Sequence, residues 1–233
     1  FYHQISVGHV EAGLRTGNKF SPFPEEINRK LTSSLSDLNF APTENARENL
    51  LREGVSAEKI FVTGNTVIDA LKQTVRADFT FADKFLNELD KRVILVTTHR
   101  RENLGEPMRN VYRALKKILA DFPDAEIIFP VHKNPKVREL VNAELGNVSQ
   151  VHLIEPLDYE PFANLMSRVT LILTDSGGVQ EEAPALGKPV LVLRSTTERP
   201  EAVKYGTVKL VGTNPMDIIS NTQLLLDNPR KYK

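Results

Sequence analysis

Apolar, β-branched runs alternate with helix-period segments along most of this chain, and that alternation constrains its fold more than any other feature. The runs predict strands over Lys59–Thr63, Arg92–Thr97, Glu126–Phe129, Val151–Ile154, Leu171–Thr174, Val190–Leu193 and Thr207–Val211. The segments between them predict helices over Pro107–Phe122, Pro135–Leu145, Tyr159–Arg168 and Val179–Leu186. Strands that alternate with helices at this spacing indicate parallel βαβ units. The sequence therefore predicts an α/β fold with a doubly wound parallel sheet.

The predicted strands divide the chain into two α/β domains. Residues 92–233 hold six of the strands, enough for a complete domain. Residues 1–66 hold fewer and read as the C-terminal part of a first domain, which we expect to be incomplete. Residues 67–91 are polar and lack a strand pattern, so the junction between the domains is predicted there.

Both ends of the sequence suggest a longer parent chain. Phe1–Val10 starts with alternating apolar residues and no initiator methionine, so it reads as a strand already under way. Asn221–Lys233 shows a helical pattern that stops in a basic tail without a cap. We therefore expect an amino-terminal portion to be missing.

Composition excludes several classes of protein. The chain has 30 basic and 30 acidic side chains, which argues against a nucleic-acid binder or a binder of acidic membranes. No apolar run approaches the roughly 20 residues needed to cross a bilayer, and no secretory signal opens the sequence. Zero cysteines exclude disulfides, thiolate metal sites and a cysteine nucleophile. A soluble, cytoplasmic protein is the expectation.

Chemistry-bearing residues follow the predicted strands of the larger domain. Ligands of open parallel sheets bind beyond the carboxyl ends of the strands. His99, His132, the Ser176-Gly177-Gly178 turn and Arg199 each follow a strand there, so we expect them to gather on one rim. Neither histidine belongs to a cluster with metal-ligand spacing, so no metal site is expected.

The Ser176-Gly177-Gly178 turn has two interpretations. Glycines between a strand and a helix let the backbone approach a phosphate or diphosphate. Glu181 and Glu182 follow in the first turn of the helix, where a carboxylate can accept hydrogen bonds from two ribose hydroxyls. Alternatively, Asp175 or Ser176 simply caps the helix, and the glutamates complement its dipole. The other residues predicted on the same rim favour the binding site.

Two loops of the first domain carry carboxylates. Glu11 lies in a glycine-bounded loop after a strand, where it has no obvious structural role. Glu25 and Glu26 open a helix whose dipole they could merely complement. Paired carboxylates facing a cleft would act as general acid and base.

Long, ordered motifs now point to a family. They are H-V-E-A-G-L-R-T-G from His9, S-P-F-P-E-E-I-N-R from Ser21, T-G-N-T-V-I-D-A from Thr63, T-T-H-R-R-E-N from Thr97, P-V-H-K-N-P from Pro130, T-D-S-G-G-V-Q-E-E-A-P from Thr174 and T-T-E-R-P-E-A from Thr196. Together they resemble the bacterial non-hydrolysing UDP-N-acetylglucosamine 2-epimerases over nearly the whole sequence. The resemblance implies two Rossmann-like domains of glycosyltransferase-B type, with the active site between them and UDP bound by the second.

The resemblance also implies an activity and a set of site residues. The family interconverts UDP-N-acetylglucosamine (UDP-GlcNAc) and UDP-N-acetylmannosamine (UDP-ManNAc) by elimination and readdition of UDP through a glycal, which supplies ManNAc for cell-surface polysaccharides. The matching positions imply catalytic roles for Glu11, Glu25 and His99. They imply substrate contacts for Arg15, His132, Ser176, Gly177, Gly178, Glu182 and Arg199.

No cofactor is expected, since the sequence has no G-x-G-x-x-G for a nicotinamide. A homodimer is expected, and a second UDP-GlcNAc is a candidate allosteric activator. Four alternatives stay open at this point. They are a hydrolysing epimerase that releases free ManNAc, an epimerase of a diacetamido sugar nucleotide, a glycosyltransferase-B-type transferase and a catalytically silent nucleotide-sugar sensor.

Overall fold

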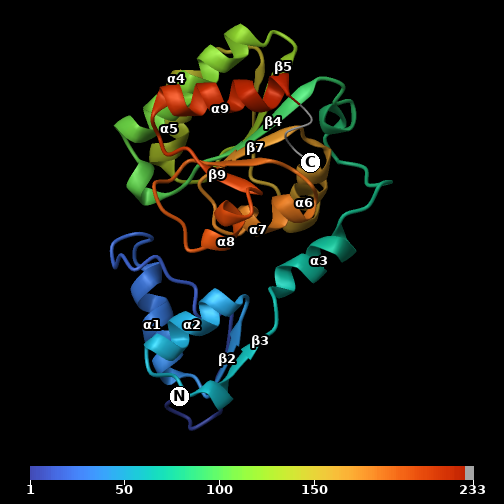
Figure 1. Ribbon diagram of the computed structural model, residues 1–233. Helices are drawn as coiled ribbons and strands as arrows, with labels where there is room; N and C mark the ends of the chain where they lie inside the picture. The colour runs from blue at the N-terminus through green and yellow to red at the C-terminus, as the bar shows by residue number, and fades with distance from the viewer. Residues whose placement is uncertain (229–233) are drawn as a thin grey trace. The chain divides into compact units, whose positions relative to one another are not determined.

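The computed structural model describes residues 1–228, which fold as two compact units (Figure 1). Unit 1 comprises Phe1–Ala70 together with the short segment Thr196–Arg199. Unit 2 comprises Leu71–Ser195 and the chain from Pro200 onward. The chain therefore leaves unit 2 after Ser195 and re-enters it at Pro200.

Unit 1 is built on a three-stranded parallel sheet of order β1-β2-β3. Its strands are β1 (Gly8–Val10), β2 (Leu38–Ala41) and β3 (Ile60–Val62), and its helices are α1 (Glu25–Leu35), α2 (Glu44–Arg52) and the first part of α3 (Thr66–Thr74). Thr43 caps α2 by accepting the backbone N–H of Ala46, as N-cap threonines do. The core of this unit is small and contains Ala12, Leu14, Ala41, Ala46, Leu50 and Ile60.

The structure corrects the prediction for the start of the chain. The expected strand over Phe1–Val10 begins only at Gly8, and the residues before it are mostly exposed. An alternation of apolar residues indicates a strand only where one face is buried, and that condition is not met in this structure before Gly8. β2 and α2 were not predicted from the sequence.

Unit 2 contains a six-stranded parallel sheet of order β6-β5-β4-β7-β8-β9, and the predicted α/β class is confirmed. The strands are β4 (Arg92–Thr97), β5 (Ala125–Pro130), β6 (Val151–Ile154), β7 (Leu171–Thr174), β8 (Val190–Val192) and β9 (Val208–Leu210). All six were predicted, each to within one residue at both ends. β4 pairs with both β5 and β7, so the strand order reverses beside β4.

The helices of unit 2 are α4 (Glu106–Asp121), α5 (Pro135–Leu145), α6 (Tyr159–Arg168), α7 (Val179–Ala185), α8 (Pro200–Lys204) and α9 (Pro215–Asp227). Those from α4 to α8 connect successive strands, and α9 follows the last strand. α5 and α9 start alike, since Asn134 and Asn214 each accept a backbone N–H and a proline follows. Short 3₁₀ helices lie at Ala57–Lys59 in unit 1, and at Lys84–Asn87 and Arg101–Asn103 in unit 2.

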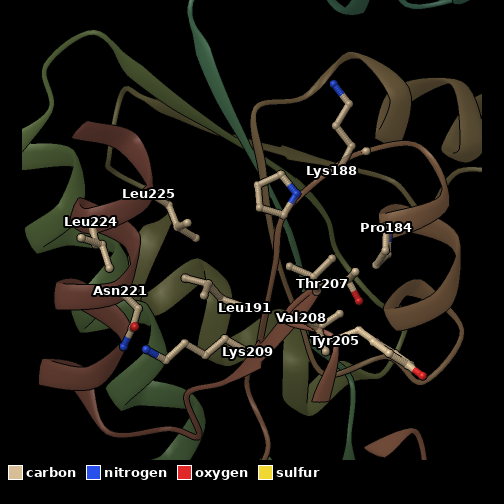
Figure 2. A pocket seen from close by; sticks show the side chains of 14 residues that line it. Pro184, Lys188, Leu191, Tyr205, Thr207, Val208, Lys209, Asn221, Leu224 and Leu225 are labelled. Atoms are coloured by element: carbon tan, nitrogen blue, oxygen red, sulfur yellow. The ribbon is translucent and has the colours of Figure 1, made fainter. Parts of the chain in front are cut away.

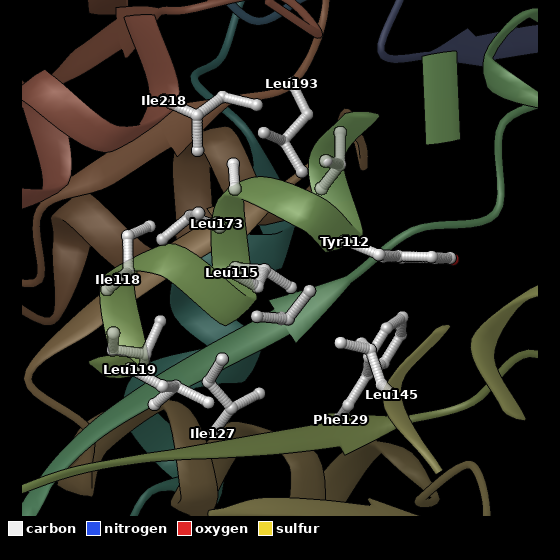
Figure 3. Close-up of a cluster of buried hydrophobic side chains, with 14 of the residues drawn as sticks. Tyr112, Leu115, Ile118, Leu119, Ile127, Phe129, Leu145, Leu173, Leu193 and Ile218 are labelled. Carbon is white, nitrogen blue, oxygen red and sulfur yellow. The ribbon is translucent and has the colours of Figure 1, made fainter. Parts of the chain in front are cut away.

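Hydrophobic clusters cover both faces of the larger sheet. Side chains alternate along β4, so Ile94 and Val96 pack in one cluster while Val93 and Leu95 pack in the other. The first cluster lies under α4, α5 and α9, and Figure 3 shows the side chains of Tyr112, Leu115, Ile118, Ile127, Phe129 and Ile218 among its members. The second involves α6, α7 and the chain between α3 and β4. Burial on both faces explains why these strands read as continuous apolar runs.

The last predicted helix lies earlier in the chain than the sequence pattern indicated. α9 spans Pro215–Asp227, whereas the pattern was placed over Asn221–Lys233, and the predicted basic tail lies outside the described residues. Within residues 1–228, no helix combines the length and the apolar character needed to span a lipid bilayer.

Candidate functional site

The carboxyl edge of β4, β5 and β7 carries a cavity in unit 2. It has a volume of about 230 Å³, and its lining includes His99, His132, Ser176, Phe162 and Val179. His99 follows β4, His132 follows β5 and Ser176 follows β7, and β4 is the strand at which the order of the sheet reverses. A crevice at such a switch point is the usual ligand site of an open α/β sheet. The structure thus brings these three residues together, as their positions after parallel strands predict.

Asp175 is fully buried directly after β7 and fixes the loop that follows β4. Its carboxylate accepts the backbone N–H of His99 at 3.1 and 3.0 Å, the backbone N–H of Arg100 at 3.0 Å and the Asn103 Nδ2 at 3.3 Å. The His99 Nδ1 lies 3.1 Å from Asp175 Oδ1. Burial alone would raise the pKa of Asp175, but the His99 side chain and these N–H groups hold it below its ordinary value.

His132 stacks against His99. The ring centroids are 5.6 Å apart and the ring planes differ by 19°. The His132 Nδ1 accepts the backbone N–H of Asn134 at 3.1 Å. Desolvation, and then the nearby His99, lower the pKa of His132, which favours a neutral imidazole at pH 7.

The turn before α7 does not use a side-chain cap. Its N-cap is Gly178, which provides none, and Asp175 bonds the loop after β4 instead. Ser176 donates its own backbone N–H to the Thr174 Oγ1 at 2.9 Å. Capping by Asp175 or Ser176, the alternative interpretation of this turn, is therefore not observed.

Glu182 lies close to the glycines of that turn. It is 7% exposed, and a Cβ placed on Gly178 would come within 3.4 Å of the Glu182 Oε2. Desolvation, and then the charge of Glu182, raise the pKa of Tyr159 to about 12. Tyr159 therefore stays protonated and shares a hydrogen bond with the Glu182 carboxylate. A buried carboxylate beside two glycines is suited to ligand hydroxyls.

Unit 1 carries a second group of predicted residues, around Glu11. Glu11 follows β1 with a φ of 64°, a left-handed conformation that is uncommon for non-glycine residues. Its Oε1 accepts Arg199 at 2.8 Å and the Asn65 Nδ2 at 3.2 Å. Arg199 also donates to the fully buried Glu198 at 2.8 Å. The structure therefore groups Arg199 with Glu11 in unit 1, whereas the sequence analysis assigned it to the larger domain.

Arg15 and the start of α1 are the other parts of unit 1 that carry predicted site residues. The Arg15 guanidinium forms a two-pronged ion pair with Glu53, with contacts of 3.0 and 2.8 Å. Glu26 is buried and accepts the backbone N–H groups of Thr16 at 3.0 Å and Gly17 at 2.9 Å. Glu25, the predicted catalytic residue, is the partly buried first residue of α1.

Sequence reasoning missed the roles of Asp175, Glu26 and Glu198. Each is a buried carboxylate that holds either a backbone loop or an arginine. An aspartate placed directly after an apolar strand, as Asp175 is, was the available signal, but it was interpreted as a helix cap. In the described part of the chain, no group of three or more His, Asp or Glu is arranged to hold a metal ion.

A larger cavity lies elsewhere in unit 2, with a volume of about 280 Å³ (Figure 2). Its lining comes from the starts of β8 and β9 and from α9, and includes Lys188, Tyr205, Lys209 and Leu224. It therefore lies at the amino ends of the strands, opposite the edge that carries His99. The lining contains none of the predicted site residues.

Comparisons with known proteins agree with the arrangement. The sequence profile of the UDP-N-acetylglucosamine 2-epimerase family matches residues 1–233. A UDP-N-acetylglucosamine 2-epimerase of Bacillus subtilis is 56% identical over 234 residues, covering 100% of this chain and 61% of the relative. The chain thus spans about three fifths of the length of the curated relatives it matches.

Solved structures give the same result. The crystal structure of UDP-GlcNAc 2-epimerase from Neisseria meningitidis bound to UDP-GlcNAc matches with a TM-score of 0.94 at 51% identity, covering 100% of this chain and 63% of that one. That of the Methanocaldococcus jannaschii enzyme in complex with UDP-GlcNAc and UDP matches with a TM-score of 0.87 at 40% identity, covering 97% and 64%. The fold is thus of glycosyltransferase-B type, with Rossmann-like units, and this chain covers part of it. On its sequence profile and its architecture, the chain belongs to the UDP-N-acetylglucosamine 2-epimerase family.

Proposed function

We propose that the protein containing this chain interconverts UDP-GlcNAc and UDP-ManNAc without hydrolysing them, and so supplies ManNAc for cell-surface polysaccharides. The observation that carries the proposal is the match to a UDP-GlcNAc-bound epimerase at 51% identity and a TM-score of 0.94. The carboxylates of unit 1, and the histidines and glycines of unit 2, are the groups that such a reaction requires.

The chemistry favours elimination and readdition of UDP. The C2 proton of the sugar is not adjacent to a carbonyl, so simple enolisation cannot remove it. Breaking the bond between C1 and the diphosphate oxygen, with loss of the C2 proton, gives an enol-ether glycal and UDP. Readdition of UDP with a proton delivered to the opposite face of C2 gives the epimer. This route needs proton-handling groups near C2 and stabilisation of the departing diphosphate.

Roles for individual residues follow from this chemistry. We assign proton handling at C2 to Glu11 and Glu25, and interaction with the departing diphosphate to His99. Hydrogen bonds from Arg199 and Asn65 support the assignment for Glu11, because they orient its carboxylate. Arg199 then has a positioning role in addition to the UDP contact that the resemblance implies.

The remaining substrate contacts belong to UDP. We assign the diphosphate to Ser176, Gly177 and Gly178, and the ribose hydroxyls to Glu182. Arg15 and His132 are further substrate contacts implied by the resemblance. The pairing of Arg15 with Glu53 means that Arg15 must exchange a partner to reach a ligand directly.

Proton NMR of the full-length enzyme with UDP-GlcNAc in deuterium oxide tests the proposal. We expect UDP-ManNAc carrying deuterium at C2, because elimination discards the original proton. Free ManNAc and UDP would instead identify a hydrolysing enzyme, and transfer of the sugar to an added acceptor would identify a transferase. Binding without turnover would identify a sensor. Homodimerisation, activation by a second UDP-GlcNAc and cytoplasmic location stay predictions.

A further inference from the structure

Asp175 is a buried charged group to which the proposed reaction gives no role. Asp175 is fully buried. Among the described contacts of its carboxylate, the one with an ionisable side chain is to the imidazole of His99. Its other partners are the backbone N–H groups of His99 and Arg100 and the amide of Asn103. A buried carboxylate aimed at a histidine in a ligand cavity is the arrangement that commonly orients a reacting imidazole.

The contact between Asp175 and His99 determines where the imidazole proton resides. An ionised carboxylate can only accept hydrogen bonds. Because the His99 Nδ1 lies 3.1 Å from Asp175 Oδ1, that nitrogen must carry the proton. The Nε2 of His99 is then the nitrogen left for chemistry in the cavity, as a lone pair in the neutral ring.

The stacked neighbour has the opposite arrangement. The His132 Nδ1 accepts the backbone N–H of Asn134 at 3.1 Å, so in the neutral ring its proton resides on Nε2. The two rings, with centroids 5.6 Å apart, therefore present different groups from their Nε2 atoms. His99 presents an acceptor that can take up and release a proton, whereas His132 presents a fixed donor.

We propose that Asp175 is a positioning residue that fixes the orientation and the Nδ1–H tautomer of His99, so that the His99 Nε2 faces the substrate. The role rests on the proposed function, in which His99 interacts with the departing diphosphate. In that reaction the C1–O bond breaks and its electron pair leaves on the diphosphate oxygen. The C2 proton goes to a carboxylate of unit 1. When the His99 Nε2 has first taken up a proton from solvent, it donates a hydrogen bond to that oxygen and keeps the proton, while the Asp175 carboxylate offsets the charge of the imidazolium.

Nitrogen-15 NMR of the imidazole rings in the ligand-free, full-length protein tests the tautomers without any turnover. We expect His99 to show a protonated Nδ1 and an unprotonated Nε2 at pH values where the ring is neutral, and His132 to show the reverse. A wild-type His99 with its proton on Nε2 would overturn the proposal. This measurement is independent of whether the enzyme is an epimerase.

Asp175→Asn and Asn103→Ala separate positioning from support of the loop. Asn103 donates hydrogen bonds to the same carboxylate and to the Leu193 carbonyl. We expect Asp175→Asn to lose the single tautomer and to lower kcat by about 10²-fold, the lower range for a general acid–base group, with UDP affinity within a few-fold of wild type. Asn103→Ala should keep the tautomer and most of kcat.

Two results contradict the proposal. One is an Asp175→Asn variant that keeps both the Nδ1–H tautomer and kcat. The other is an Asn103→Ala variant that loses kcat as severely, which would mean that Asp175 only supports the loop. If the wild-type enzyme does not epimerise UDP-GlcNAc but His99 shows the Nδ1–H tautomer, the proposed function fails and the positioning of His99 stands.

Discussion

Glu25 and Glu26 are adjacent in α1, and their substitutions separate catalysis from stability. Glu25→Gln keeps the size of the side chain but removes the base, so we expect kcat of the full-length enzyme to fall by about 10²-fold or more. UDP affinity and the melting temperature should stay close to wild type. Steady-state kinetics, calorimetry with UDP and thermal unfolding measure the three quantities. An unchanged kcat would remove Glu25 from proton handling.

Glu26→Gln is the matched control. Its carboxylate is buried and accepts the backbone N–H groups of Thr16 and Gly17. Replacing one acceptor oxygen by an NH₂ leaves a donor facing a donor, which costs about 1–3 kcal/mol of unfolding free energy. We therefore expect a lower melting temperature for Glu26→Gln. A Glu26→Gln variant that is stable but inactive would assign catalysis to Glu26, and would contradict its assignment to stability.

Glu182 allows a test of the ribose contact. Glu182→Ala should weaken UDP binding by about 1–3 kcal/mol, the cost of losing a hydrogen-bond partner that is charged. Glu181→Ala, one position away and less buried, is the control and should bind UDP like wild type. Calorimetry that gives equal affinities for the two variants would exclude Glu182 from the nucleotide site.

The positions of the residues around His99 could be predicted from the sequence, but the position of Arg199 could not. His99, His132 and Ser176 each come directly after a parallel strand, and this predicted that they lie around one cavity. The carboxyl ends of parallel strands lie at the same edge of the sheet, whatever the conformation of the loops. The position of Arg199 was not predictable in this way. It depends on the segment Thr196–Arg199 packing with unit 1, and that packing follows from contacts distant in sequence.

At the scale of elements, the loop after β1 packs tightly against α2 at Gly13. Gly13 has a φ of 86°, and a Cβ there would lie 2.1 Å from the Ala46 carbonyl oxygen. Gly54 has nearly the same φ, 85°, but no described atom within 4 Å of its Cβ position. Both alanine substitutions carry left-handed strain of about 1–2 kcal/mol, and Gly13→Ala adds roughly 1–3 kcal/mol for the clash.

Chemical denaturation of the two variants measures the difference directly. Because the backbone strain is shared, the excess loss of stability in Gly13→Ala reports the close approach of the loop to α2. Equal losses in the two variants would mean that the loop moves away from α2 at little cost. The Asn49 Nδ2, which donates to the Gly13 carbonyl at 2.9 Å, opposes such a movement.

The elements of the two units were not equally predictable. β7 is buried along its whole length and has a continuous apolar sequence. Such a sequence is typical of a central strand in a parallel sheet, so β7 was predictable. β2 contains the buried Asn39, which breaks the apolar pattern, and α2 buries only Ala46 and Leu50. Neither has a periodicity strong enough to distinguish it from a loop.

Within residues 1–228, the two units differ greatly in the apolar surface they bury. The unit 1 core consists of six buried residues, three of them alanines, whereas unit 2 has two extensive clusters on the faces of its sheet. Burial of apolar surface contributes about 25 cal/mol per Å², so unit 1 has much less to offset its conformational entropy. In this 233-residue chain by itself, the free energy of local opening should therefore be lower in unit 1.

Hydrogen exchange of this 233-residue chain, followed by mass spectrometry, tests that difference. We expect peptides covering β2 and α2 to exchange well before those covering β4 and β7. β6 is the internal control, because it is a half-buried edge strand of unit 2. If unit 2 unfolds cooperatively, the backbone amides of β6 should exchange more slowly than those of β2, although both strands belong to parallel sheets. Uniform protection would instead mean that the units unfold together, and that the small core of unit 1 does not limit its stability.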